Sequence, residues 1–92
     1  AANSSLTVRF PGLFEGQITG CVRLTGGTNF TLLGEDLDDL GAFVGLFDFV
    51  SGVTVEVNVA KAVQATPCQY VISNPNAAPI TVQYSLHQCR YS

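Results

Sequence analysis

The most reactive side chains in the sequence belong to three cysteines and one histidine. His87 and Cys89 lie two positions apart, and a neighbouring histidine can convert a cysteine into a thiolate nucleophile. On a β-strand, however, residues two apart are separated by about 7 Å, whereas a nucleophile and its base need a hydrogen bond of about 3 Å. The spacing therefore predicts an exposed histidine rather than a catalytic pair.

The one concentration of charged residues is acidic and comprises Glu35, Asp36, Asp38 and Asp39. A calcium loop of the helix-loop-helix kind would need alternating aspartates, a glycine and a more distant bidentate glutamate, and this cluster has a different spacing. The short motifs of serine hydrolases, zinc proteases and phosphate-binding loops do not occur in the sequence. We therefore expect no enzyme activity, no bound metal and no cofactor.

Hydrophobic alternation divides the cysteines between two kinds of strand face. Cys68 has the same parity as the apolar residues that follow it, which predicts a buried free thiol. Cys21 and Cys89 fall on the polar faces of their predicted strands. We expect a disulfide between these two, either within one chain or between two chains.

Length and composition indicate a single secreted domain. Ninety-two residues are enough for one hydrophobic core. Charged residues make up only 12% of the chain and hydrophobic residues 47%, so the surface has little charge to keep it apart from other surfaces. Methionine is absent, and the sequence starts with two alanines, which is typical of the mature side of a signal-peptide cut. We expect a secreted, extracellular or cell-surface protein.

Two partner classes are not expected from the charge and hydropathy patterns. The net charge is −3 and the four basic residues are scattered, whereas nucleic acid binding needs clustered Lys and Arg. The longest apolar stretch, 42–50, contains Gly45 and Asp48 and is much shorter than the roughly 20 residues that span a bilayer. Asn3 and Asn29 begin Asn-x-Ser/Thr triplets and are candidates for glycan attachment on an exterior protein.

The spacing of apolar residues predicts a mainly β, antiparallel fold of about six strands with one short helix. Apolar residues alternate with polar ones in six segments: 6–10, 16–25, 28–33, 53–63, 68–72 and 80–86. Over 36–48 they recur at intervals of three and four after the acidic cluster, which predicts a helix between the third and fourth strands. Two architectures fit this order, a β-sandwich and a small barrel of the oligonucleotide/oligosaccharide-binding type.

The amino-terminal segment 1–10 could belong to its own sheet or to a neighbouring molecule. Leu6, Val8 and Phe10 form an alternating strand that Pro11 and Gly12 separate from the rest. Such a strand can add to an exposed sheet edge, and edges are usually protected by lysine, of which this chain has one.

We therefore expect a non-enzymatic extracellular structural protein, a homo-oligomer or polymer that assembles into a filament or surface layer by strand addition. A small secreted module that binds a sugar, peptide or protein is the alternative. A secreted toxin or inhibitor is a third interpretation of the same composition.

Overall fold

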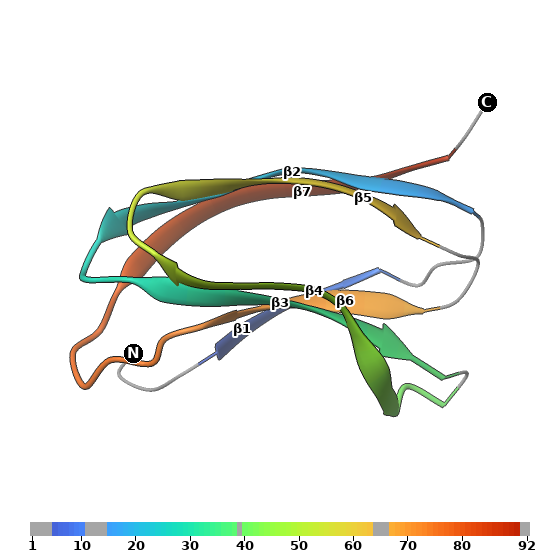
Figure 1. Ribbon diagram of the computed structural model, residues 1–92, viewed down its shortest axis with the longest axis horizontal. Coiled ribbons are helices and arrows are strands. Elements are labelled where there is room, and N and C mark those ends of the chain that lie inside the picture. The colour runs from blue at the N-terminus through green and yellow to red at the C-terminus, as the bar shows by residue number, and fades with distance from the viewer. Residues whose placement is uncertain (1–4, 11–14, 39, 64–66, 91–92) are drawn as a thin grey trace.

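The computed structural model of the chain describes residues 5–10, 15–38, 40–63 and 67–90, which form two antiparallel sheets (Figure 1). The strands are β1 (Ser5–Phe10), β2 (Gly16–Gly26), β3 (Phe30–Leu37), β4 (Phe43–Val53), β5 (Glu56–Val63), β6 (Cys68–Ser73) and β7 (Thr81–Arg90). One sheet has the order β1-β6-β3-β4 and the other has the order β5-β2-β7. The predicted mainly β, antiparallel character is confirmed.

The hydrophobic core lies between the two sheets, which Figure 1 shows as two layers. Alternation on the central strands supplies this core from both layers, because every second side chain of a strand points to the same face. Ile18 and Val22 of β2 face Phe30 and Leu32 of β3, and all four are fully buried. The sequence pattern therefore predicted the inner faces of the central strands correctly.

The predicted helix at 36–48 is wrong, since this segment forms a hairpin of β3 and β4. β3 continues to Leu37, a turn follows, and β4 starts at Phe43. Asp38 stabilises the turn, because its Oδ1 accepts hydrogen bonds from the backbone amides of Leu40 and Ala42, each at 2.9 Å. Gly41 adopts a positive φ of 84°, which suits a tight turn and not a helix interior.

The residues of β4 also explain why the helical spacing was misleading. Phenylalanine and valine, which are frequent in this segment, have a high preference for strands and a modest one for helices. Of the carboxylates that were assigned to a helix N-terminus, Glu35 and Asp36 lie at the end of β3 and Asp38 lies in the turn, whereas Asp39 lies outside the described residues. The strand preference of these residues and the turn at Asp38 therefore outweigh the helical spacing of three and four, and the segment forms a hairpin.

The regular valine series at 53–59 is divided between two strands in different sheets. Val53 ends β4, Val55 lies exposed in a turn, and Val59 is buried in β5. β5 pairs with β2 in its own molecule, with Val59 opposite Gly20. Alternation was thus correct for β5 but was extended too far toward the amino end.

The described part of the chain contains no helix that is long and apolar enough to cross a membrane.

Candidate functional site

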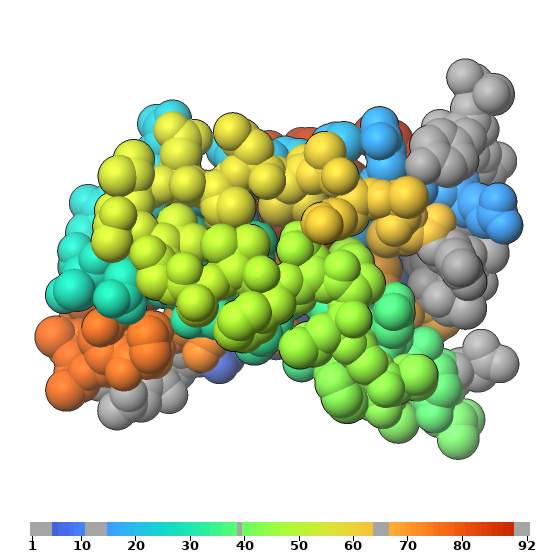
Figure 2. Space-filling model, viewed as in Figure 1, coloured from blue at the N-terminus to red at the C-terminus, as the bar shows by residue number. Residues whose placement is uncertain are grey.

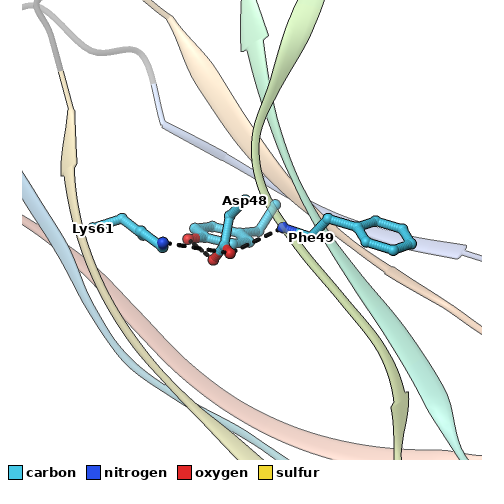
Figure 3. Close-up of polar contacts among 4 residues, drawn as sticks. Asp48, Phe49 and Lys61 are labelled. Carbon is cyan, nitrogen blue, oxygen red and sulfur yellow. Dashed lines mark hydrogen bonds and ion pairs between the residues drawn. The ribbon is translucent and has the colours of Figure 1, made fainter.

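Polar contacts of Asp48 on β4 join three strands (Figure 3). The hydroxyl of Tyr70 on β6 donates to Asp48 Oδ2 at 2.9 Å, and the backbone amide of Phe49 donates to Oδ1 at 2.9 Å. Lys61 Nζ on β5 lies 3.8 Å from Asp48 Oδ1. Because β5 belongs to the other sheet, Asp48 links the two layers at this side of the molecule.

The surroundings of Tyr70 favour a structural role for the polar contacts around Asp48. The side chain of Tyr70 is fully buried, and its ring meets that of Phe47 edge to face at 5.4 Å between centroids. Burial, followed by the hydrogen bond and the negative charge of Asp48, raises the pKa of Tyr70 well above its usual range. Tyr70 therefore stays a protonated donor at any physiological pH.

A cleft of about 480 Å³ lies between the β3–β4 hairpin and the end of β5. It is lined by Asp36, Leu37, Asp38, Val44, Phe47, Ala62 and Val63. This volume is in the range of small-molecule sites, but such sites also need several convergent polar groups. Asp38 already accepts two backbone amides, so Asp36 is the principal polar group that a ligand would meet.

The acidic cluster is dispersed along the hairpin. Glu35 accepts a hydrogen bond from the side chain of Gln69 at 2.6 Å, and Asp38 accepts a hydrogen bond from a backbone amide of the β3–β4 turn. Among the residues described, no group of three or more His, Cys, Asp and Glu is arranged to hold a metal ion.

The three cysteines are free, which corrects the expectation of a Cys21–Cys89 bridge within one chain. Cys21 lies opposite Ser85 of β7, whereas Cys89 lies opposite Gln17 of β2. The two cysteines are therefore displaced by four residues along the β2–β7 pair, or about 13 Å. A disulfide requires Cα atoms less than about 7 Å apart, so the register forbids this bond. A bond between two chains stays a prediction, because Cys89 is exposed.

Cys68 lies in the core, where only 1% of its surface is exposed. Burial, followed by the negative charge of Asp36, raises the pKa of the Cys68 thiol to about 11. Asp36 is its direct register partner on β3. The thiolate needed for nucleophilic or redox chemistry is therefore disfavoured at neutral pH.

His87 and Cys89 belong to the same strand, β7, and both are exposed. The ring nitrogen Nε2 of His87 lies 3.0 Å from Ser85 Oγ. Ser85, two positions before His87, was missed as its partner, although side chains two apart on a strand share a face. The pair lies in the open on a sheet surface, whereas nucleophilic catalysis also needs a third group that orients the base.

Of the two candidate glycosylation sites, the structure describes only the second. Asn3 lies outside the described residues. Asn29 is half-buried in the connection between β2 and β3, and its backbone carbonyl accepts a hydrogen bond from the side chain of Asn76 at 2.8 Å. Asn76 in turn bonds Asn74, so this end of the molecule is held by an asparagine network.

The candidate assembly residues Leu6, Val8 and Phe10 lie on β1, which pairs with β6 of its own molecule. The register is unbroken from Ser5 opposite Ser73 to Phe10 opposite Cys68. Phe10 is buried, Val8 is partly buried, and Leu6 remains 42% exposed. An exchange of this strand between molecules stays a prediction.

Large hydrophobic side chains are exposed mainly along β4, at the edge of its sheet. We call Leu40, Phe43, Val44, Leu46 and Phe49 the hairpin surface; each is more than half exposed. Figure 2 shows the side chains of β4 and of the preceding turn uncovered on the near face of the molecule. Exposed apolar patches of this kind are typical of interaction surfaces. This patch was not predicted, because Leu40, Phe43 and Val44 were expected on the apolar face of a helix.

The four sheet edges differ in their protection against pairing. β5 carries Glu56 and Lys61, β1 has only six residues, and β4 carries the exposed apolar side chains of the hairpin surface. β7 is ten residues long, contains no Lys, Pro, Asp or Glu, and pairs with β2 without interruption from Arg90 to Val82. β7 is therefore the most permissive long edge in the described part of the chain.

Comparison of the chain with known protein families, with curated proteins and with solved structures finds no match.

Proposed function

We propose that the protein is a non-enzymatic structural subunit of the cell exterior, which assembles with copies of itself into a filament or surface layer by strand addition. The observation that carries this proposal is the hairpin surface, four large apolar side chains exposed on the edge strand β4 and a fifth, Leu40, in the turn before it. Their exposure to water is unfavourable by roughly 25 cal/mol for each Å² of apolar area, and a contact with another molecule removes it.

We further propose that the two sheets form a β-sandwich rather than a closed barrel. Support comes from the strand orders, which leave β1 and β4 as the ends of one sheet and β5 and β7 as the ends of the other. A closed barrel has no such ends. Open edges supply the unpaired backbone groups that strand addition requires.

A small binding module is the second candidate, and the 480 Å³ cleft beside the hairpin favours it. Its apolar lining and the carboxylate of Asp36 would suit a ligand with a hydrophobic group next to a positive charge. Such a module would work as a monomer.

Electron microscopy of negatively stained protein at increasing concentration tests the proposal. Assembly by strand addition predicts particles longer than a single domain, and their number should rise with protein concentration. The measurement should be made with and without a reducing agent, because the exposed Cys89 could link chains covalently. Dispersed single domains at the highest concentration, in both buffers, would favour the binding module and contradict assembly.

A further inference from the structure

The large exposed hydrophobic residues gather on two opposite sides of the molecule. The described residues contain eight of them: the hairpin surface supplies five, Val55 lies in the β4–β5 turn, and Leu6 and Tyr84 lie on β1 and β7. The Lys61–Asp48 ion pair and the β4–β5 turn place β4 and β5 on one side. β1 and β7 end the two sheets on the other side, which we call the open side.

Leu6 and Tyr84 point toward the interior, although both are more than 40% exposed. Residues directly opposite each other on paired strands share a face, and the partners of Leu6 and Tyr84 are Ile72 and Val22, which are buried. Inward side chains are normally covered by the facing sheet. On the open side the cover over Leu6 is incomplete, because a three-stranded sheet lies on a four-stranded one, and Tyr84 is exposed because β7 is the end strand of its sheet.

A single additional strand on β7 would complete the cover. It would extend the order β5-β2-β7 to four strands and match the four strands of the other sheet. β7 offers the unprotected edge for this strand, and Tyr84 and Leu6 are the inner-face side chains that the strand would cover.

We propose that the hairpin surface of a second copy fills this position, so that β4 of one molecule lies along β7 of the next. Phe49 lies opposite Leu33, and Leu46 lies opposite Glu35, on the outer face of β3. Both side chains therefore point away from their own core, where they can contact the open side of a neighbouring molecule. This inference rests on the proposed self-assembly and specifies which two surfaces meet.

The exposed area is sufficient for such a contact. Each residue of the hairpin surface exposes on the order of 100 Å², and without Val44, which lines the cleft beside β5, the other four give roughly 400 Å² in all. Backbone and rim atoms of an added strand bring this close to the roughly 800 Å² per partner of a stable interface.

The geometry is head-to-tail, because the two surfaces are different and lie on opposite sides of one chain. A contact between unlike surfaces leaves one of each free at the ends of every oligomer. Growth therefore continues to a filament where the rotation between subunits does not close a ring, and in neither case is the product a closed dimer of two like surfaces.

Two substitutions separate the two surfaces. Phe49→Glu places a charge on the hairpin surface and Tyr84→Glu places one on the open side; both positions are exposed, so the fold should tolerate the change. Ala60→Glu on exposed β5 is the matched control. Molar mass is measured by light scattering after size exclusion, in reducing buffer. We expect wild type and Ala60→Glu to polymerise, and each of the other two variants alone to remain a monomer.

The mixture of Phe49→Glu with Tyr84→Glu gives the decisive result. Each variant retains the surface that the other has lost, so an equimolar mixture should double in mass to a dimer and stop there. A polymerising wild type whose variants do not complement each other, or a Tyr84→Glu variant that dimerises alone, would overturn the head-to-tail contact but leave self-assembly standing. A monomeric wild type would overturn both. Leu46→Glu and Leu6→Glu serve as a second pair if circular dichroism shows that a first variant has unfolded.

Discussion

At the scale of single residues, the buried hydrogen bond between Tyr70 and Asp48 is the polar contact most central to the fold. It ties β6 to β4, and Asp48 in turn faces Lys61 across the two layers. Side chains of this kind are costly to bury alone and favourable when paired, so they fix which strands lie together. The sequence showed a single aspartate in an apolar stretch, but it did not show the tyrosine 22 residues away that satisfies it.

Replacing Tyr70 with phenylalanine should lower the free energy of unfolding by about 1 to 3 kcal/mol, because the carboxylate of Asp48 loses a buried donor while the ring packing is retained. Urea denaturation followed by circular dichroism measures this loss. Tyr84→Phe is the control, since the side chain of Tyr84 is half-exposed. An equal effect of the two substitutions would contradict the role assigned to the Tyr70 hydroxyl.

The Cys68 thiol should make stability fall at alkaline pH. Its pKa is raised from 9.0 to about 11 in the folded protein, so the unfolded chain loses this proton at lower pH than the folded chain does. The contribution is complete below about pH 9 and is lost as the pH rises toward about 11, with a size on the order of 2 kcal/mol.

Denaturation midpoints of wild type and Cys68→Ala between pH 7 and pH 11 measure this effect. The wild type should lose more stability over this interval than the variant, which lacks the titrating group. The other ionising groups are common to both proteins, and their contributions largely cancel in the comparison; Cys68 is the smallest of the causes that raise the pKa of Tyr70. Parallel curves would show that Cys68 ionises equally in both states.

At the scale of secondary-structure elements, alternation predicted the inner faces of β2 and β6 from the sequence alone. Ile18 and Val22, like Tyr70 and Ile72, are buried as the period of two requires. The error at 36–48 has a physical cause. Apolar residues at intervals of three and four occur by coincidence when a β-strand is bulged, and the β3–β4 pairing has three register shifts.

The close approach of β2 and β7 at Gly20 gives a prediction for this pair of strands. A Cβ atom at Gly20 would collide with the backbone carbonyl of Ser85, and the φ of Gly20 is 145°. Gly20→Ala should therefore destabilise the protein by at least 2 kcal/mol, because two backbones must separate. Thermal unfolding monitored by circular dichroism gives the change in midpoint.

Gly45→Ala on β4 is the matched control, because open space surrounds its Cβ position. This substitution should leave stability unchanged or raise it slightly, since alanine restricts the unfolded chain more than glycine does. Equal destabilisation by both substitutions would mean that the β2–β7 contact is looser than the structure has it.

At the scale of the whole molecule, exposure depends on which strands lie at the edges, and this could not be predicted from the sequence. Tyr84 has the parity of an inward residue, yet it is half-exposed because β7 ends its sheet. The same holds for the disulfide: parity placed Cys21 and Cys89 on polar faces, but only the pairing register shows that they lie four residues apart. The exposure of Tyr84 and the separation of the two cysteines both depend on which strands pair and in which register, and a local sequence pattern does not contain this information.

The two apolar surfaces give the molecule unlike ends, with the hairpin surface on the β4 side and the open side at β1 and β7. In the proposed assembly, a neighbouring molecule covers Leu6 and Tyr84, which belong to the core faces of their sheets but are partly uncovered. We propose that association is the step that completes the core.

Sedimentation velocity of the wild-type protein, over a hundredfold range of concentration in reducing buffer, tests self-assembly most directly. We predict a sedimentation coefficient that rises continuously with concentration, because a head-to-tail contact that does not close into a ring leaves a free surface at each end of every oligomer. A single species with the 9.7 kDa mass of one chain at every concentration would contradict the central claim.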